Sequence, residues 1–282
     1  MCLMTLNSKV LKAFGLSGQL QLIAQRENRV YRVGGWAIRA HRPNYRTFAE
    51  IEAELSLLAI LNEANCEVPK PGFAQNIDDQ IYSSVSWIDG KTLSELSNIP
   101  LDIFQALGHL LKKIHRVPIP RLQRPIWDVD AILGEAPLWG RWQDHPDLTT
   151  EQYKIFSLLR SCPALPELQL VHGDALRENV MVIGNIVYLI DFDDCAYSYP
   201  SFDIATILAK EWQNPSYEDI KNALLIGYGS VAERELSFML ALRALTYVGW
   251  VKDRIMEPNI AAKSREVLDR AEYFARQYIE TV

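Results

Sequence analysis

The sequence contains no run of apolar residues approaching the ~20 that a membrane-spanning helix needs. Its N-terminus also lacks the apolar core and the small-residue cleavage site of a secretory signal. Internal repeats and low-complexity tracts are absent as well. These absences predict a globular protein of the cytoplasm, with no membrane as a partner.

Cysteine is scarce and scattered. Four cysteines occur in 282 residues, and no two of them form a C-x-x-C pair. This spacing fits neither a disulfide framework nor a zinc site. Reduced thiols in a cytoplasmic protein are the simplest interpretation.

Basic residues are fewer than acidic residues. The 29 lysines and arginines are outnumbered by 35 aspartates and glutamates, which gives a net charge of −6. We therefore expect no nucleic-acid partner, although a local basic pocket for phosphates remains compatible. A chain of this length, 49% hydrophobic, can bury a sizeable core as one large or two modest domains. Nothing in the sequence indicates the oligomeric state.

The most informative stretch is residues 171–194. Two short apolar runs, at 179–183 and 186–190, flank the pair Gly184-Asn185. Such a pair between β-branched runs is typical of a tight hairpin turn, because the turn needs a positive φ. The sequence therefore predicts a β-hairpin here.

Polar side chains stand where the predicted strands of this stretch begin and end. Asp174 follows an apolar run at 168–171, Asn179 opens the hairpin, and Asp191 follows its second strand. Loops at strand ends are a frequent place for chemistry. Two carboxylates and one carboxamide are oxygen donors, and Mg²⁺ prefers few carboxylates together with waters and substrate phosphates. The three residues are candidate ligands or catalysts.

The motifs around these residues resemble those of kinases. His-Gly-Asp at 172–174, followed by Asn179, resembles the catalytic loop H-x-D-x-x-x-x-N. Asp-Phe-Asp at 191–193 resembles D-F-G, with aspartate in the glycine position. The H-G-D form and the continuation over 191–205 resemble the aminoglycoside phosphotransferase and choline kinase superfamily. Within it, the nearest likeness is to the homoserine-kinase-like and stress-response-kinase-like branches.

The resemblance covers nearly the whole chain and implies an α+β, two-lobed, protein-kinase-like fold. A nucleotide-binding lobe with an antiparallel sheet and one main helix would span residues 1–89. A larger, mostly helical lobe for catalysis and acceptor binding would span 90–282. The implied activity is ATP-dependent transfer of the γ-phosphate to a hydroxyl of a small molecule, with Mg²⁺.

Two alternatives stay open. The first is a protein Ser/Thr kinase of the stress-response type. A small acceptor is favoured over it because no activation loop with an A-P-E signature follows Asp191. The second is a nucleotide-binding regulator with little catalysis. The acceptor and the choice of ATP or GTP are not fixed by the sequence.

The same resemblance implies roles for individual residues. Asp174 would accept the hydroxyl proton or orient the hydroxyl, while Asn179 and Asp191 would hold the metal. Asp203, in a P-x-x-D-x-A step, would bind backbone amides of the catalytic loop. The carboxylates at 193–194 depart from D-F-G, and metal, acceptor and turn-capping roles all stay open for them.

The nucleotide would be held by the first lobe. The turn at 25–28 would cover its phosphates, although the usual glycines are missing. Arg39 stands in the strand position of the phosphate-binding lysine, and it is open whether arginine replaces that lysine. Glu54 is the expected partner of Arg39, with Glu52 as the competitor.

The hinge between the lobes would follow the last strand of the first lobe. The backbone of residues Ser86, Trp87 and Ile88 would bond adenine there, a prediction that rests on position alone.

The insert at 121–150 is rich in tryptophan, proline and aspartate, and would either line the acceptor pocket or pack as an ordinary loop. Tyr197 and Trp212 are near enough in sequence to touch the acceptor. His115 is assigned no chemistry.

Periodicity and capping residues predict the remaining elements. A leading helix is expected within 1–18, and a three-strand meander over 20–41. The other expected strands lie at 72–75 and 80–87. Further helices are expected at 47–64, 92–96, 101–115, 151–160, 201–210, 217–228, 233–251 and 259–279. Their expected caps are Thr47, Thr92, Thr150, Ser201 and Ser216.

Overall fold

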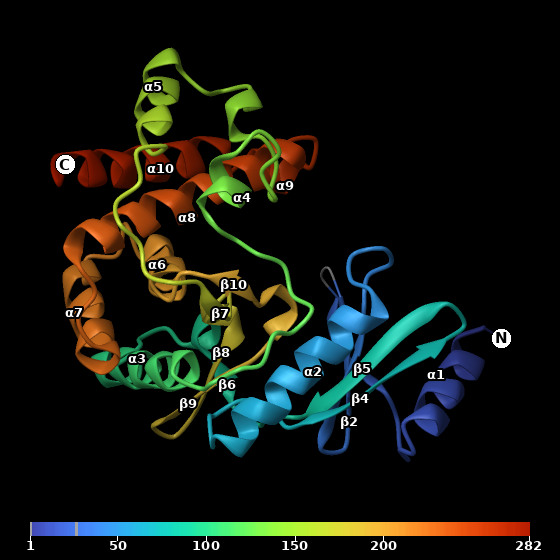
Figure 1. The fold of residues 1–282 in the computed structure, drawn as a ribbon. Helices are drawn as coiled ribbons and strands as arrows, with labels where there is room; N and C mark the ends of the chain where they lie inside the picture. The colour runs from blue at the N-terminus through green and yellow to red at the C-terminus, as the bar shows by residue number, and fades with distance from the viewer. Residues whose placement is uncertain (1, 26–27) are drawn as a thin grey trace.

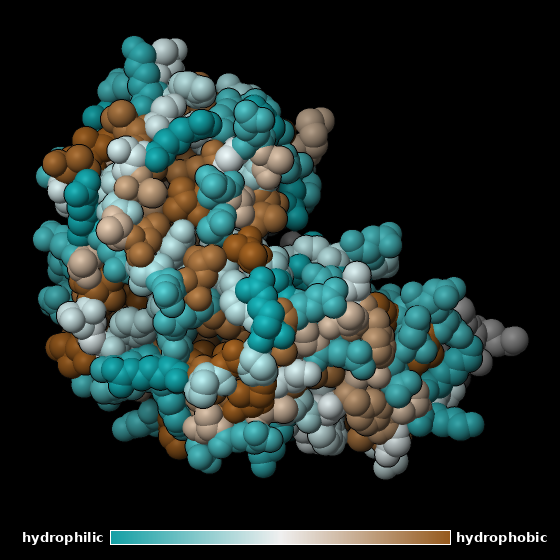
Figure 2. All heavy atoms as spheres, viewed as in Figure 1, coloured by the Kyte–Doolittle hydropathy of each residue, from teal (hydrophilic) through white to brown (hydrophobic). Residues whose placement is uncertain are grey.

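The computed structural model describes residues 2–25 and 28–282, with side chains from residue 7 onward. The chain forms an N-terminal lobe built on a sheet and a larger, mostly helical lobe that follows it (Figure 1). The surface is indented between the lobes, so that the molecule is L-shaped in outline (Figure 2). The central part of the turn predicted to cover the phosphates, residues 26–27, lies outside the described residues.

The first lobe is built on a five-stranded antiparallel sheet in the order β1-β2-β3-β5-β4. Its strands are β1 (Gln21–Gln25), β2 (Arg29–Val33), β3 (Trp36–Ala40), β4 (Pro71–Ile77) and β5 (Gln80–Ser86). The predicted meander and the following hairpin are therefore confirmed. The turn between β4 and β5 uses Asp78 and Asp79, both with positive φ, which aspartate tolerates better than most residues.

Two helices accompany this sheet. Helix α1 (Cys2–Ala13) packs with the sheet in a small apolar cluster that includes Val10, Phe14 and Ile38. Helix α2 (Phe48–Glu63) begins at a capping box made by Thr47 and Glu50, as predicted. The leucines of α2 belong instead to the large apolar cluster of the second lobe. Helix α2 is thus held by both lobes.

The second lobe contains most of the helices. Its strands are short: β6 (Lys91–Thr92), β7 (Gln169–Val171), β8 (Val180–Ile183), β9 (Ile186–Leu189) and β10 (Ala196–Ser198). Its helices are α3 (Leu101–His115), α4 (Val129–Leu133), α5 (Thr150–Leu158), α6 (Ser201–Lys210), α7 (Tyr217–Tyr228), α8 (Glu233–Asp253), α9 (Pro258–Ala261) and α10 (Ser264–Glu280). Among the described residues, no helix is both long and apolar enough to cross a membrane.

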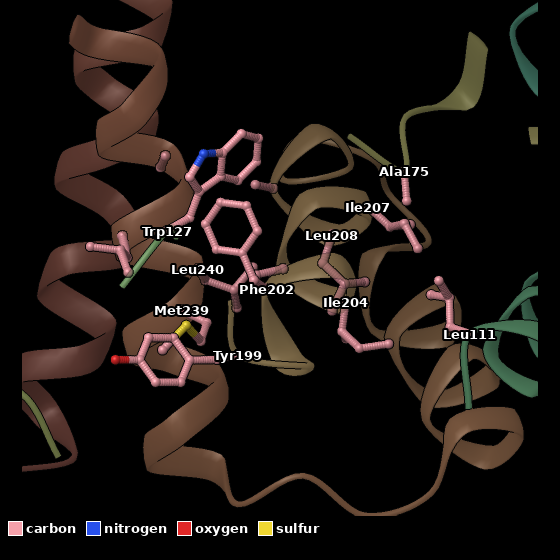
Figure 3. Packing of buried hydrophobic residues seen from close by; sticks show 14 of the residues in the cluster. Leu111, Trp127, Ala175, Tyr199, Phe202, Ile204, Ile207, Leu208, Met239 and Leu240 are labelled. Carbon is pink, nitrogen blue, oxygen red and sulfur yellow. The ribbon is translucent and has the colours of Figure 1, made fainter. Parts of the chain in front are cut away.

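The core of this lobe lies around α6 and α8. Phe202 and Ile204 of α6 are fully buried, as is Met239 of α8 (Figure 3). Trp127 from the insert meets the Phe202 ring edge-on, with centroids 6.1 Å apart. The β8–β9 hairpin contributes buried residues to the same apolar cluster, namely Val180, Val187 and Leu189.

Helices α6 and α7 have the predicted bounds and α5 begins one residue early, but three of the predicted capping residues are wrong, for reasons visible in the backbone. Helix α5 is capped by Thr149 rather than Thr150, because Thr149 has the extended conformation that lets its hydroxyl reach Gln152 N. Pro200 already has helical φ and ψ, so Ser201 lies inside α6 and makes no cap. Ser216 is not extended either, and it caps nothing.

Two further segments differ from expectation. Residues 92–96 form a 3₁₀ turn (Leu93–Glu95) rather than an α-helix, although Thr92 and Glu95 make the predicted capping box. The helix predicted over 259–279 is divided into α9 and α10. At the division, Lys263 N bonds to Ile260 O, three residues back, which tightens the chain into a turn.

Candidate active site

The hairpin β8–β9 sets the spacing of the candidate residues. Its register pairs Val180 with Leu189, and Ile190 N donates a 2.9 Å hydrogen bond to Asn179 O. Asn179 therefore lies opposite the residue that precedes Asp191. The turn at Gly184 has a φ of 60°, as a tight hairpin requires.

Asp203 holds the loop that carries Asp174. Its two carboxylate oxygens accept hydrogen bonds from His172 N and Gly173 N, both at 2.8 Å. Nε2 of His115 lies 3.0 Å from the same carboxylate. Burial alone would raise the pKa of Asp203, but the His115 hydrogen bond and the amide donors hold it below its usual range. The structure thus shows the amide contacts predicted for Asp203, and it gives His115 a part in orienting that carboxylate.

The His172 side chain is buried between the loop that carries Asp174 and the end of β9. Its Nε2 lies 2.9 Å from Ile190 O, and its Nδ1 accepts a 3.2 Å hydrogen bond from Asp174 N. Burial lowers the pKa of the imidazole, so the neutral ring with a proton on Nε2 fits both bonds.

Asp174 is held from two sides. Arg243 of α8 places Nη2 3.0 Å from Asp174 Oδ1. Asn179 donates from Nδ2 to Asp174 Oδ2 at 3.1 Å and to Asp174 O at 2.9 Å. Burial raises the pKa of the Asp174 carboxyl to about 7. Arg243 opposes this shift, while Asp194 and Asp191 add to it.

Asp191 has a left-handed backbone, with a φ of 65°. A non-glycine residue in this region carries strain that a functional site commonly holds. Its side chain is 44% exposed, and Oδ1 lies 2.9 Å from Nη2 of Arg39. The orientation of that contact is unsuited to a hydrogen bond, and Oδ1 has no other hydrogen-bond partner.

Arg39 joins Asp191 to Glu54. Its Nη1 donates to the two carboxylate oxygens of Glu54 at 3.0 and 3.3 Å. Glu54 is buried, whereas its competitor Glu52 is exposed. Burial raises the pKa of Glu54 to about 6 even though Arg39 acts in the opposite direction. The attraction of Asp191 and Glu54 outweighs burial and raises the pKa of Arg39.

The two carboxylates after Phe192 face the first lobe. Asn28 donates to Asp193 Oδ2 at 3.2 Å. Asp194 Oδ1 accepts hydrogen bonds from the Tyr45 hydroxyl at 2.5 Å and from Arg46 Nη2 at 3.0 Å. Both aspartates therefore bridge the lobes.

Arg124 is a second bridge that the sequence did not reveal. This buried side chain donates from Nε to Cys195 O at 2.8 Å and from Nη1 to Glu50 O at 3.1 Å, and it also bonds Asp193 O. It thereby ties the start of α2 to the loop after Asp191. An isolated arginine in an insert carries no motif that would have signalled this contact.

The predicted hinge lies at the end of β5. Ser86 N donates to Lys70 O and Trp87 N donates to Gly35 O, each at 2.8 Å. Their amides are therefore engaged within the sheet. Of the three hinge residues, only Ile88 has an amide without a backbone hydrogen bond in the described part of the chain.

The aromatic side chains expected near an acceptor are mostly used for packing. Trp127 and Trp142 are buried, and Trp139 packs 4.2 Å from Trp127, centroid to centroid. Tyr197 is buried and its hydroxyl accepts a hydrogen bond from Leu122 N. Trp212 packs against the Tyr273 ring. The insert therefore contributes core packing in this structure.

Arg243 is the residue of the site that motif analysis missed. It contacts Asp174 across 69 residues of sequence, which no local spacing encodes. The sequence does hold one indication that Arg243 is paired, since it is the sole charged residue within 236–251. A lone charge on a buried helix is paired in most proteins.

The comparison of the whole sequence with known families decides the affiliation. Residues 19–239 match the phosphotransferase enzyme family. The chain belongs to this family. The suspected superfamily is thus confirmed, and the two-lobed kinase-like fold agrees with it.

The chain is also similar to a protein among the curated sequences. An uncharacterized protein of Synechocystis sp. is 27% identical over 238 residues. The match covers 77% of this chain but only 65% of that relative's length.

Solved structures share the fold over nearly the whole chain at low identity. An amicoumacin kinase in complex with AMP-PNP, Ca²⁺ and its ligand has a TM-score of 0.73 at 18% identity, covering 96% of each chain. A choline/ethanolamine kinase family protein from Mesorhizobium loti has a TM-score of 0.72 at 16% identity, covering 97% of this chain and 95% of its own. A spectinomycin phosphotransferase with ADP and spectinomycin has a TM-score of 0.68 at 16% identity, covering 98% and 97%.

Proposed function

We propose that this protein transfers the γ-phosphate of ATP to a hydroxyl group of a small molecule, with Mg²⁺. The observation that carries the proposal is the grouping of Asp174, Asn179 and Asp191. A hydrogen bond joins Asp174 to Asn179, and the hairpin register places Asp191 at the adjoining strand end. Family membership and nucleotide-bound neighbours support the same reaction class.

The donor set fits Mg²⁺. Asp191 Oδ1 is ion-paired with Arg39 Nη2 at 2.9 Å but accepts no hydrogen bond from the described residues. Asn179 uses its Nδ2 on Asp174, which leaves its Oδ1 for a cation. The described residues contain no cluster of three or more His, Cys, Asp or Glu side chains that could hold a metal by themselves. A cation here would rely on nucleotide phosphates, as Mg²⁺ commonly does. When bound, it would neutralise charge on the phosphates.

Asp174 is placed to receive the hydroxyl proton. A pKa of about 7 lets it be largely ionised slightly above neutral pH and still accept a proton during the reaction. Arg243 fixes one of its oxygens, and Asn179 fixes the other. In a loose transition state such positioning is the main catalytic work.

Arg39 is proposed to hold nucleotide phosphates in place of lysine. Its Glu54 contact fixes the guanidinium, and its second amino group faces Asp191. A planar guanidinium can bind phosphate in a bidentate way. The adenine is proposed to bond to the hinge at Ile88.

A small acceptor is favoured over a protein. From Asp191 the chain passes through β10 and enters α6 at Ser201, which leaves no long segment for an activation loop. The regulator alternative is disfavoured because Asp174 has no evident use in a protein that only binds nucleotide.

The decisive experiment measures ADP release with a panel of hydroxyl compounds and Mg·ATP. We expect release with at least one member, and we expect Asp174→Asn to lower kcat about a thousandfold while nucleotide binding is retained. The matched control is Asp144→Asn, which removes an exposed carboxylate paired with Arg141. Equal turnover in the Asp174→Asn variant and the wild type would show that Asp174 has no catalytic role.

A further inference from the structure

A group of basic side chains surrounds the ring of Tyr247. Nζ of Lys210 lies 4.2 Å from the ring centroid, and the guanidinium carbons of Arg243 and Arg270 lie at 4.4 and 4.8 Å. The three cations come from α6, α8 and α10. We call Lys210, Arg243, Tyr247 and Arg270 the basic cluster.

The basic cluster adjoins the proposed catalytic aspartate. Arg243 Nη2 lies 3.0 Å from Asp174 Oδ1 and donates to the Tyr247 hydroxyl at 3.2 Å. A molecule whose hydroxyl reaches Asp174 would therefore have its remaining groups within reach of the cluster.

Arg270 lacks a full set of partners. Its side chain is 2% exposed, yet its Nε has no hydrogen-bond partner among the residues that the structure describes. Nη1 meets Glu266 only at 3.4 Å, and Glu266 is half exposed. A buried guanidinium with an unused donor is costly unless something pairs with it. Burial, reinforced by Arg243, lowers its pKa despite the opposing effects of Tyr247 and Glu266.

Lys210 lies at the open side of the cluster. The residue is exposed to solvent, and its ammonium packs on the Tyr247 ring. Desolvation, followed by repulsion from Arg270 and Arg243, lowers the pKa of Lys210 to about 8, and Glu178 only partly offsets this. Lys210 is therefore repelled by the two arginines, although Arg243 also faces Asp174 and Arg270 also faces Glu266.

We infer that the phosphate acceptor carries an anionic group, a carboxylate or a phosphate, which the basic cluster binds while the acceptor hydroxyl lies at Asp174. The inference rests on the proposed function and specifies its substrate class. An anion would supply the partner that Arg270 Nε lacks, and the ammonium of Lys210 would close over it. A cationic acceptor would meet repulsion from three basic side chains at this place.

Binding is tested on the full chain loaded with Mg·AMP-PNP. Calorimetric titration at constant ionic strength compares glycerate, glycerol phosphate, glycerol and serinol, which share a three-carbon hydroxylated backbone. We expect glycerate or glycerol phosphate to bind at least about tenfold more tightly than glycerol, with serinol weaker still. The comparison of the first two probes distinguishes a carboxylate from a phosphate.

Variants of Lys210 locate the binding. Lys210→Gln should reduce the ratio of anionic to neutral affinity about tenfold, and Lys210→Arg should restore most of it. The matched control is Lys221→Gln, since Lys221 also lies over a tyrosine ring but belongs to α7. It should leave the ratio unchanged.

The outcomes separate this inference from the proposed function. Equal binding of all four probes, tighter binding of serinol, no binding of any probe, or an unchanged ratio in Lys210→Gln overturns the inference. ADP release with serinol but not with either anionic probe also overturns it, yet leaves the proposed function standing. Selective binding of an anionic probe without ADP release from any hydroxyl compound supports the basic cluster and contradicts phosphotransfer.

Discussion

At the residue scale, Arg39 and Glu54 form an ion pair that is largely removed from solvent. Glu54 is 4% exposed at the side chain and would be costly to bury without Arg39. Arg39 in turn faces Asp191, so one guanidinium serves two carboxylates. This arrangement keeps Arg39 charged and fixed where phosphates are proposed to bind.

Glu54 also predicts a dependence of stability on pH. Its pKa is about 6 in the folded protein and about 4.5 in an unfolded chain, so the folded state binds this proton more tightly. The stabilising effect of its proton is complete below about pH 4.5 and is lost as pH rises through 6. Relative to Glu54→Gln, the wild type should lose about 2 kcal/mol of unfolding free energy across this window.

Urea unfolding at a series of pH values measures this difference. Glu52→Gln, which changes the exposed neighbouring glutamate on α2, is the control and should follow the wild type at every pH. If the curves of wild type and Glu54→Gln ran parallel, the assigned protonation of Glu54 would be wrong.

At the element scale, the loop that carries Asp174 and the loop after Asp191 approach each other closely at Gly173. Its φ is 81°, and an added Cβ would lie 2.5 Å from Asp194 O and 2.6 Å from the Trp127 ring. Gly184 in the hairpin turn has a comparable φ of 60° but open space around it. An alanine at Gly184 would therefore meet backbone strain alone, whereas an alanine at Gly173 would meet both backbone strain and a steric clash.

We expect Gly173→Ala to reduce the unfolding free energy by about 3 kcal/mol, since strain and collision both contribute. Gly184→Ala should cost about 1 kcal/mol from backbone strain alone. Chemical denaturation measures both, and ADP release should fall far more in Gly173→Ala. Similar costs in the two variants would show that the loops are not closely packed.

The elements were largely predictable because their signals are local. The capping box at Thr47, the apolar stripe of α3 and the turn at Gly184 each lie within a few residues, and the structure has all three. The start of α6 was predicted correctly, but the capping role expected of Ser201 was wrong, because side-chain type does not determine the φ and ψ on which a cap depends.

The site was predictable only where a motif marks it. Asp174, Asn179 and Asp191 lie at fixed spacing around one hairpin, the first two before its first strand and Asp191 after its second. The contacts of Arg243 and Arg124 link segments about 70 residues apart, so they depend on how helices and the insert pack. Local patterns hold no information about such pairings.

At the scale of the whole molecule, the lobes are joined by more than the hinge. Arg124 of the second lobe bonds Glu50 O of α2 and two carbonyls of the loop after Asp191. The leucines of α2 pack in the larger core. A domain boundary at residues 89 and 90 remains a prediction, and these contacts would couple the lobes across it.

Arg124→Met should loosen this coupling. We expect amide hydrogen exchange over residues 191–195 to become about tenfold faster, because the carbonyls lose their charged donor. Arg121→Met is the control, as Arg121 lies in the same insert but packs over the Tyr197 ring. Unchanged exchange in Arg124→Met would contradict a bridging role.

The most direct test of the account is a crystal structure of the protein with Mg²⁺ and AMP-PNP. The account predicts a cation about 2.0–2.1 Å from an Asp191 carboxylate oxygen and from Asn179 Oδ1, with the γ-phosphate on the side of Asp174. Nucleotide bound away from the β8–β9 hairpin, or a cation held by neither residue, would contradict it.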